Sequence, residues 1–321
     1  MRLFSIVIPV YNRPDEVDEL LHSLTKQSYT HFEVLIIEDG STKKCDHIVE
    51  KYGKLLNISY YYKPNTGQGF SRNFGFERAK GDYYVVFDSD CLIPKSYFEI
   101  VNEYLNKHQL DAFGGPDKAH DSFTPIQKAI SYSMTSVFTT GGIRGGKKRM
   151  GAFHPRSFNM GISAEVFEKT KGYKITRMGE DIEFSIRIIE GGFKTGLIEE
   201  AYVYHKRRTS LSQFYNQLHF FGRARINISR FYPEEIKLVH LFPAVFTAGF
   251  LALWLVPLVS FSLFYVGLGL LAVYYFLIFV DSLSKNKSLA VAILSIATSF
   301  TQLFAYGIGF FTEGWRKITQ G

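Results

Sequence analysis

Residues 83–90 read Tyr83-Tyr84-Val85-Val86-Phe87-Asp88-Ser89-Asp90, and the fold class follows from them. Its first five residues are aromatic or β-branched, which is typical of a buried strand, and two carboxylates follow directly. Alternate residues of an extended chain point the same way, so Asp88 and Asp90 are expected to face one site. Carboxylate oxygens suit Mg²⁺ or Mn²⁺, and the alternative for such a pair is a solvated turn.

Strands and helices alternate upstream of this stretch. Apolar runs predict strands over 5–10, 32–37 and 58–62, and apolar residues at helical spacing predict helices over 14–27, 45–52 and 69–79. This alternation predicts an α/β fold whose mainly parallel sheet is covered by helices on both faces.

Polar clusters follow three of these strands, at Pro9–Arg13, Glu38–Ser41 and Asp88–Asp90. Ligands of parallel sheets bind beyond the carboxyl ends of the strands, so the clusters mark a candidate site. Neither G-x-G-x-x-G nor G-x-x-x-x-G-K-[ST] occurs, which argues against a Rossmann dinucleotide site and a P-loop. A nucleotide would therefore be held by acids and a metal ion.

Four further side chains are candidates, each with a structural alternative. Glu180 and Asp181 open a predicted helix, where they either stabilise its N-terminus or supply a general base near a pyrophosphate. Arg72 lies in a segment rich in small residues and either holds a phosphate or base or is exposed beside a turn. His205 precedes a basic run and either completes a metal or pyrophosphate site or lies on the surface.

Composition and charge exclude several classes of protein. The chain has 321 residues and is 46% hydrophobic, which excludes a disordered protein. Residues 1–200 contain 26 basic and 26 acidic side chains, residues 201–238 contain 7 and 2, and residues 239–321 contain 4 and 2. The net charge of +7 thus lies mostly in a basic collar rather than on the globular part, which argues against nucleic-acid binding.

The C-terminal part is predicted to meet a membrane. Residues 239–280 contain no Asp, Glu, Lys or Arg, and 42 residues suffice for two spans of about 20, with a break near Pro257–Ser262. A second uncharged stretch, 288–312, is long enough for a third span. The alternative is a buried helical hairpin of a soluble protein.

The basic residues suggest an orientation. Lys285 and Lys287 lie between the uncharged stretches, so this connection and the collar are expected on the cytoplasmic face of a multi-pass inner-membrane protein. A third full span would place Arg316 and Lys317 outside, so the last segment is either re-entrant or carries too few charges to matter. The N-terminus shows no signal-peptide pattern, and the two cysteines fit a reducing compartment.

Two basic segments each have two interpretations. Apolar residues at helical spacing in the collar favour an amphipathic helix on anionic lipid, and the alternative is a domain helix with its apolar face inward. The stretch 144–149 is either an acceptor loop that recognises lipid phosphate or a surface loop. We thus expect a globular domain over 1–205, an interfacial segment over 206–238 and a membrane domain over 239–321.

Taken together, the motifs resemble family 2 inverting glycosyltransferases with the GT-A nucleotide-diphospho-sugar transferase fold. The resemblance runs from residue 5 to about residue 210. Its motifs come in order: the opening strand Ser5–Asn12, Glu38–Ser41 for D-D-G-S with Glu in place of the first Asp, Asn65–Asn73 for N-x-G and A-R-N, Asp88–Asp90 for D-x-D, and Asn159–Gly161 followed by Gly179–Asp181 for the acceptor side.

The resemblance implies a mixed, mainly parallel GT-A sheet and a donor nucleotide site. That site would comprise Pro9, Tyr11, Asn12, Glu38, Asp39, Arg72 and Asp88. Within it, Asp39 would contact the base and Asp88 would lie near the ribose. The replacement of the first acid of D-D-G-S leaves the role of Glu38 open.

The resemblance also implies the chemistry. Mn²⁺ or Mg²⁺ would be held by Asp90, with Asp88 and His205 beside it, and would neutralise the leaving pyrophosphate. Asp181 would be the catalytic base and Glu180 would help position the acceptor. The family reaction displaces the nucleoside diphosphate directly, with inversion at the anomeric carbon.

The expected function is a membrane-anchored, metal-dependent inverting glycosyltransferase. It would move one sugar from a nucleotide-sugar donor to a lipid-linked or other membrane-proximal saccharide acceptor in glycan or polysaccharide biosynthesis. Processive synthases of the family carry Q-x-x-R-W after the acid pair, and no such motif follows here, which favours a single transfer. The alternatives are a nucleotidyltransferase that forms the activated sugar, or a transporter or membrane scaffold that only binds nucleotide.

Overall fold

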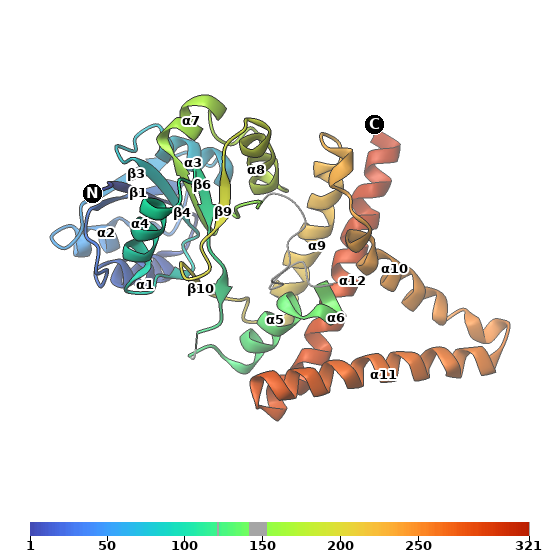
Figure 1. Cartoon of the computed structure of the whole chain (residues 1–321). Helices are drawn as coiled ribbons and strands as arrows, with labels where there is room; N and C mark the ends of the chain where they lie inside the picture. Colours follow the sequence, from blue (N-terminus) through green and yellow to red (C-terminus); the bar gives the residue numbers. More distant parts are fainter. Residues whose placement is uncertain (121, 141–152, 321) are drawn as a thin grey trace. The chain divides into compact units, whose positions relative to one another are not determined.

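The computed structural model describes residues 1–120, 122–140 and 153–320 (Figure 1). These residues form two compact units, which we treat separately. The first comprises residues 1–120 and 153–206, and the second comprises residues 122–140 and 207–320. The basic stretch 144–149 lies outside the described residues. The structure thus groups residues 122–140 with the C-terminal helices, a grouping that the sequence did not suggest.

A seven-stranded sheet in the order β3-β2-β1-β4-β8-β6-β9 forms the centre of the first unit. Its strands are β1 (Phe4–Val10), β2 (Phe32–Asp39), β3 (Ile58–Lys63), β4 (Tyr83–Phe87), β6 (Ala112–Gly114), β8 (Asn159–Ser163) and β9 (Thr195–Leu197). The four strands predicted from the sequence are confirmed within two residues at each end. A three-stranded sheet, β5 (Cys91–Leu92), β10 (Val203–His205) and β7 (Asp117–Lys118), lies in the same unit.

The four N-terminal strands of the large sheet are parallel. Strand β1 pairs in parallel with β2 from Phe4↔Phe32 to Val10↔Glu38, and with β4 on its other side. Strand β8 runs antiparallel to β4 and β6, so the sheet is mixed but mainly parallel, as expected. The ends of β2, β1 and β4 therefore lie side by side at one edge of the sheet.

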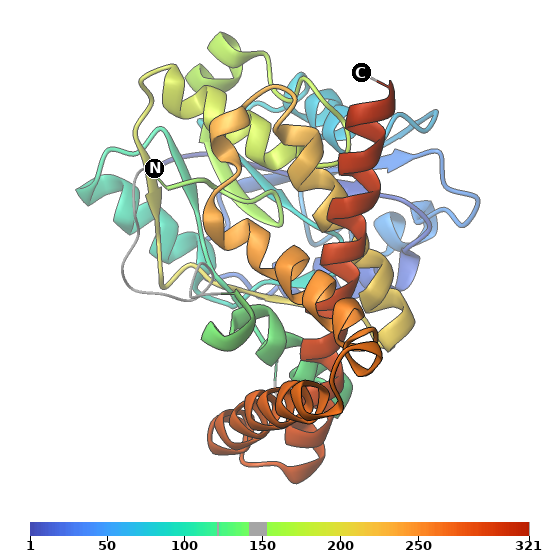
Figure 2. The same ribbon diagram turned by 90° about the vertical axis from the view of Figure 1, so that its right-hand side faces the viewer.

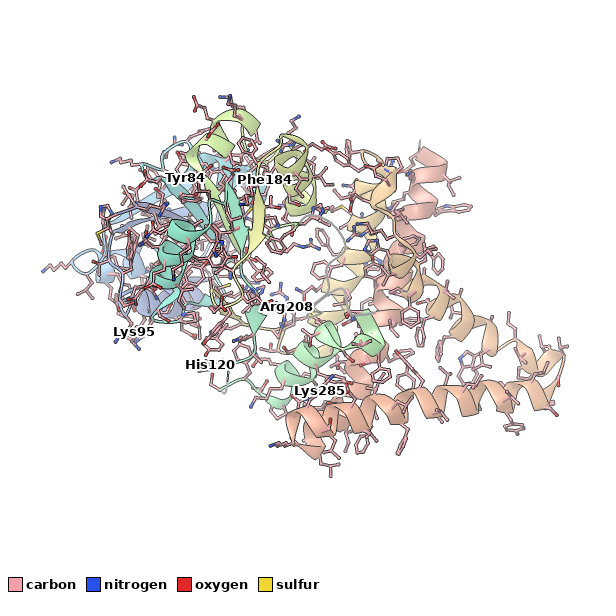
Figure 3. All side chains as sticks on the ribbon, viewed as in Figure 1. Tyr84, Lys95, His120, Phe184, Arg208 and Lys285 are labelled. Carbon is pink, nitrogen blue, oxygen red and sulfur yellow. The ribbon has the colours of Figure 1, made fainter. Side chains whose placement is uncertain are left out.

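Helices cover both faces of this sheet. They are α1 (Pro14–Leu24), α2 (Asp46–Tyr52), α3 (Gln68–Phe76), α4 (Tyr97–Lys107), α7 (Ala164–Thr170) and α8 (Glu180–Glu190). Helices α1, α2 and α4 bury their apolar side chains in one core cluster, and α3, α7 and α8 bury theirs in a second cluster across the sheet. Tyr84 of β4 and Phe184 of α8 both belong to the second cluster (Figure 3).

The second unit is helical. It consists of α5 (Pro125–Thr135), α6 (Val137–Thr140), α9 (Leu211–Ile228), η1 (Pro233–Glu235), α10 (Leu238–Leu253), η2 (Val256–Leu258), α11 (Phe261–Asn286) and α12 (Leu289–Gln320). Polar contacts join α5 to the C-terminal helices: the Tyr132 hydroxyl donates to Asp281 at 2.7 Å, and the Thr298 hydroxyl donates to the carbonyl of Ala129 at 3.1 Å.

Two helices of this unit are long and apolar enough to cross a membrane, namely α11 with 26 residues and α12 with 32. Helix α10 has 16 residues, so it is about 24 Å long and shorter than the roughly 30 Å hydrocarbon core of a bilayer. The expected break near Pro257–Ser262 is confirmed, because η2 separates α10 from α11 there.

The two long helices differ in how much of them the unit covers. Of an 18-residue apolar stretch in each helix, only 6% is buried in α11, against 44% in α12. Helix α12 runs beside α9 in both views (Figures 1 and 2), and its Ser295, Thr298 and Ser299 are fully buried. The exposed apolar surface of the unit therefore lies mainly on α10 and α11.

The apolar residues predicted for the collar lie on α9. Phe214 and Leu218 are buried against α5 and α12, where they form a core cluster with Ile130, Met134 and Ala305. These two side chains therefore fit the alternative of a domain helix with its apolar face inward, and not that of a helix lying on lipid. An interfacial role for residues 206–238 remains a prediction for their exposed side chains.

The charges near the end of α12 pair with the collar. The buried carboxylate of Glu313 accepts hydrogen bonds from Arg223 of α9 at 3.0 Å and from Arg230, two residues after the end of α9, at 3.4 Å. The Lys317 ammonium donates to the Ser229 hydroxyl at 3.1 Å. The C-terminal half of α12 thus has polar partners from α9, a helix too polar to cross a bilayer.

The backbones of α9 and α12 approach very closely at glycines. A β-carbon on Gly309 would lie 2.1 Å from the carbonyl oxygen of His219, and one on Gly222 would lie 2.0 Å from that of Tyr306. Both obstacles are backbone atoms, so a side chain at either position forces the helices apart. Small residues at such crossings are the usual means of close helix packing.

Gly309→Ala should therefore destabilise the second unit by about 1–3 kcal/mol through overpacking. Gly314→Ala is the matched control, because a β-carbon there meets nothing within 4 Å and replacing glycine in a helix is neutral or favourable. Thermal unfolding of the purified full chain in detergent measures both variants. Equal melting temperatures for the two variants would contradict the observed crossing.

Candidate active site

The predicted donor residues lie at the edge where β2, β1 and β4 end. Asp39 is the last residue of β2, and Asp88 follows β4. Residues Ile37 and Val86, two positions before these acids, both belong to the core cluster beneath α3 and α8. Because side chains alternate along a strand, Asp39 and Asp88 project on that same side of the sheet.

Asp39 is buried, and both of its carboxylate oxygens have hydrogen-bond partners. Its carboxylate accepts the backbone amides of Thr66 at 2.9 Å and Gly67 at 2.8 Å and pairs with the Lys63 ammonium. Burial alone would raise the pKa of Asp39, but the ammonium, the amide of Thr66 and the Ser71 hydroxyl outweigh it, so the pKa lies below the usual 3.8. Asp39 thereby fixes the start of the loop that leads into α3.

Glu38 projects on the opposite side of β2. It is fully buried, and its carboxylate accepts the amide of Cys45 at 2.8 Å and the hydroxyl of Tyr60 at 3.2 Å. Cys45 is the residue that precedes α2. In this structure the Glu38 side chain holds the N-terminus of α2, away from the side where Asp39 and Asp88 project.

The three donor-nucleotide residues predicted at the end of β1 differ in their surroundings. Pro9 is half-buried, and Tyr11 is 54% exposed at the end of the strand. Asn12 has a positive φ of 56°, and its side-chain oxygen accepts the amides of Thr42 at 2.8 Å and Lys43 at 2.9 Å. Asn12 thus ties the end of β1 to the loop after β2, and Tyr11 is the side chain left open to a ligand.

The predicted metal ligands lie together. The Nε2 atom of His205 is 3.0 Å from Oδ1 of Asp90 and 4.0 Å from Oδ2 of Asp88. The small sheet produces this meeting, because β10 pairs with β5 and places His205 opposite Cys91. Asp90 and His205 are more than a hundred positions apart in the sequence, so only the folding of the chain brings them together.

Cys91 completes the cluster geometrically but not chemically. Its sulfur lies within 4.8 Å of a carboxylate oxygen of Asp90 and a ring nitrogen of His205. However, Cys91 is fully buried, and burial raises its pKa well above the usual 9.0. Only a thiolate is a metal ligand, so the usable donors are two carboxylates and an imidazole, which suit Mn²⁺ or Mg²⁺.

A buried arginine connects the two acid clusters. Arg72 of α3 donates from Nη2 to Asp88 at 2.9 Å and from Nη1 to Glu180 at 3.3 Å, and it is 1% exposed. The ring of Tyr173 lies beneath the guanidinium, 5.4 Å from centroid to Cζ. A single guanidinium thus touches acids that are 92 positions apart in the sequence.

Helix α8 presents both predicted catalytic acids in its first turn, as expected. Two successive residues with positive φ, Met178 at 63° and Gly179 at 101°, turn the chain into the helix. Non-glycine residues rarely adopt this conformation, and such strain is often found at functional sites. Glu180 is buried, whereas the Asp181 side chain is 23% exposed and pairs with Arg156 at 3.1 Å.

Three residues that the sequence did not single out belong to the same network. Arg13 donates to Asp90 at 2.9 Å, Gln68 donates to the buried carboxylate of Glu180, and Arg156 donates to Asp181. Arg13 ends the polar cluster after β1, which was a usable signal. Gln68 and Arg156 reach their partners only through folding, across 112 and 25 positions, and nothing in their local sequence marks them.

The chain matches the model of the family described as Glycosyl transferase family 2 over residues 5–170, more than half of its length. It belongs to that family. The match includes β1, the loop after β2, α3 and the acids after β4, the same elements that carry the predicted donor residues. This membership confirms a glycosyltransferase and leaves the nucleotidyltransferase and scaffold alternatives without support.

Relatives of known or assigned function resemble part of the chain. TarS of Staphylococcus aureus, a poly(ribitol-phosphate) β-N-acetylglucosaminyltransferase, is 36% identical over 115 residues, which are 35% of this chain and 20% of TarS. TuaG of Bacillus subtilis, a putative teichuronic acid biosynthesis glycosyltransferase, is 31% identical over 131 residues, 40% of this chain and 52% of TuaG. The chain therefore spans between a fifth and about half of the length of these relatives.

Solved structures confirm the GT-A fold. A mannosyltransferase of Pyrobaculum calidifontis, PcManGT, solved with GDP-Man and Mn²⁺, aligns with a TM-score of 0.70 over 98% of this chain and 88% of its own, at 16% identity. Residues 1–349 of S. aureus TarS align with a TM-score of 0.50 over 71% of this chain and 66% of that one, at 21% identity. At these identities the likeness concerns the fold alone.

Asp39→Asn should lower the free energy of unfolding by about 1.5–3 kcal/mol at pH 7, the range for hydrogen bonds to charged groups. Because folding lowers the pKa of Asp39, its stabilisation is complete above the usual pKa of 3.8 and is lost as the pH falls through the folded value. The deficit of the variant should therefore shrink below about pH 4. Urea unfolding of the full chain at several pH values measures it.

Asp18→Asn is the control for this prediction. Asp18 also pairs with a lysine, Lys51, at 2.7 Å, but both side chains are solvent-exposed, at 36% and 57%. Exposed pairs of this kind contribute little to stability. A loss for Asp39→Asn no larger than that for Asp18→Asn would contradict the structural role assigned to Asp39.

Proposed function

We propose that this family 2 enzyme is a membrane-anchored, metal-dependent inverting glycosyltransferase. It moves one sugar from a nucleotide-sugar donor to a lipid-linked or other membrane-proximal saccharide acceptor in glycan or polysaccharide biosynthesis. One observation carries the proposal: Nε2 of His205 lies 3.0 Å from Asp90 and 4.0 Å from Asp88, and Arg72 joins Asp88 to Glu180 in the first turn of α8.

The donor set fits a divalent metal ion. Asp90, Asp88 and His205 supply carboxylate oxygens and one imidazole nitrogen, and these atoms converge at one edge of the sheet. Such an ion, Mn²⁺ or Mg²⁺, would neutralise the pyrophosphate as it leaves. PcManGT, which shares the fold, was solved with GDP-Man and Mn²⁺, and we propose an ion of the same class here.

The donor nucleotide would lie beyond the ends of β1 and β2. Tyr11 offers an exposed ring beside Pro9, and the loop held by Asp39 and Asn12 forms the adjoining wall. Glu38 acts indirectly in this proposal, since its carboxylate holds the start of α2. The selectivity of the enzyme for one base and one sugar depends on the contacts that it makes with the bound donor.

Asp181 would act as the general base. Its carboxylate takes the proton of an acceptor hydroxyl while the hydroxyl oxygen forms a bond to the anomeric carbon. The bond from that carbon to the phosphate oxygen breaks, and the nucleoside diphosphate leaves with the electron pair. Attack from the opposite face inverts the anomeric centre. Arg156, at 3.1 Å, orients the Asp181 carboxylate, and Glu180 fixes the first turn of α8.

The membrane anchor would be the hairpin of α10 and α11. Its exposed large apolar side chains would be costly in water and suit lipid: Leu238, Phe242, Val245, Leu251, Trp254, Leu255, Leu258, Val259, Phe261, Leu263, Tyr265, Val266, Leu270, Val273, Phe276, Leu277 and Val280. Helix α12, packed along α9 and α5, would then return beside the collar rather than form a third span. We propose the cytoplasmic face of the inner membrane for the collar and the catalytic domain.

Nucleoside diphosphate release by the purified, detergent-solubilised chain tests the enzymatic proposal. With UDP-, GDP- and TDP-sugars and Mn²⁺ or Mg²⁺, we expect slow hydrolysis of one donor that EDTA abolishes. Asp181→Asn should lower kcat by about 10²–10⁴-fold, the usual contribution of a general base. Asp90→Ala should abolish the response to metal.

Glu103→Gln is the control for these variants, since Glu103 is an exposed acid on α4, across the sheet from Asp88. It should retain full activity. Donor turnover that persists in EDTA, or that survives Asp90→Ala, would overturn the metal assignment.

Maleimide labelling tests the anchor. Both native cysteines are buried, so single cysteines report cleanly. Ile318→Cys, 80% exposed near the end of α12, should be labelled from the same side of sealed vesicles as Leu55→Cys, 68% exposed in the catalytic unit. A third full span predicts labelling from opposite sides, and extraction of the chain by alkaline carbonate would refute the anchor itself.

A further inference from the structure

We propose that Arg72 is a positioning residue that couples the metal-side acids to the catalytic turn of α8, rather than a residue that contacts the donor. The inference rests on the proposed function and deepens it. It departs from the role that the family resemblance implies for this position, which is to frame the donor nucleotide.

The first observation is that Arg72 has almost no surface to offer a ligand. Its exposure is 1%, and it is the largest fully buried side chain among the described residues. Both terminal nitrogens are used, Nη2 on Asp88 at 2.9 Å and Nη1 on Glu180 at 3.3 Å. Of its three nitrogens, only Nε has no hydrogen-bond partner within the described residues.

The second observation is the balance of charge. Burial raises the pKa of Glu180, the neighbouring Asp181 carboxylate raises it further, and the Arg72 guanidinium opposes both effects. Burial also disfavours the charge on Arg72, which is offset by its direct pairing with Asp88 and Glu180. Removing one member of such a buried set leaves an uncompensated charge, which is strongly unfavourable.

The third observation is what each carboxylate is attached to. Asp88 is two residues from Asp90 and 4.0 Å from His205, so one end of the bridge lies at the proposed metal site. Glu180 precedes Asp181 in the first turn of α8, so the other end lies at the proposed base. The planar fork of arginine holds both ends at a fixed separation, which a lysine, with one ammonium, does not.

Gln68, an exposed residue of α3, also helps to hold Glu180 in place. Its side-chain amide donates to the Glu180 oxygen that also accepts from Arg72. Glu180 is thereby held from two directions, both by residues of α3. The position of the α8 turn relative to α3 is thus determined by hydrogen bonds to one carboxylate.

Arg72→Lys is the decisive variant, because it keeps the charge and removes the fork. We expect kcat for sugar transfer to fall about 10- to 100-fold, which is the loss of one hydrogen bond between charged groups. The donor KM, and the affinity for the nucleoside diphosphate with Mn²⁺ by calorimetry, should change less than threefold. Gln68→Ala should give the same pattern with a smaller loss of kcat, and it places no buried charge at risk.

Arg187→Lys is the matched control. Arg187 forms a buried pair with Glu183 on the same helix, α8, and donates to the carbonyls of Thr170 and Gly172. It has no contact with Asp88 or Glu180 among those observed in the described residues. The Arg187→Lys variant should have a lower melting temperature, as the Arg72→Lys variant does, and an unchanged kcat.

Two results would overturn the inference while leaving the proposed function intact. A rise of donor KM of more than about tenfold in Arg72→Lys, with kcat unchanged, would show a donor contact, for which the Nε atom has no other partner within the described residues. A lower melting temperature with normal kcat and KM would show a purely structural ion pair. A wild-type chain that turns over no donor would instead overturn the proposed function, and this inference with it.

Discussion

Charge buried on the α3 side of the sheet has to be neutralised from within the protein, and Arg72 does so. Its guanidinium lies between Asp88 and Glu180, with the Tyr173 ring beneath it. Burial raises the pKa of Glu180, and the Arg72 guanidinium opposes this effect. One cation thus pairs with acids from two separate parts of the sequence, the end of β4 and the first turn of α8.

The same constraint governs the helical unit. Glu313 is buried on a largely apolar helix, and Arg223 of α9 and Arg230, just after α9, neutralise it. The close crossings at Gly222 and Gly309 bring the two helices near enough for these pairs to form. The buried charge on α12 is therefore neutralised where this helix runs beside α9. The apolar surface that remains uncovered lies mostly on α10 and α11.

Family membership and local chemistry answer different questions. The family match over residues 5–170 establishes a glycosyltransferase, and the GT-A neighbours establish the fold. The relatives are similar to this chain over only part of their length, so their acceptors are not transferable. Substrate choice is set by the few side chains that contact the substrate, so it varies within a family.

The sequence was enough to predict the four N-terminal strands, the helices between them, the helix that carries Glu180 and Asp181, and the break between α10 and α11. These features follow from local periodicity and from turn residues, which act over a few positions. It did not determine the separate faces of Glu38 and Asp39, the burial of Arg72 or the pairing of Arg156 with Asp181. Nor did it show that residues 122–140 pack with the C-terminal helices, or that α12 lies along α9. Each of these depends on contacts between residues far apart in the chain, and only the assembled sheet and helices decide which partners meet.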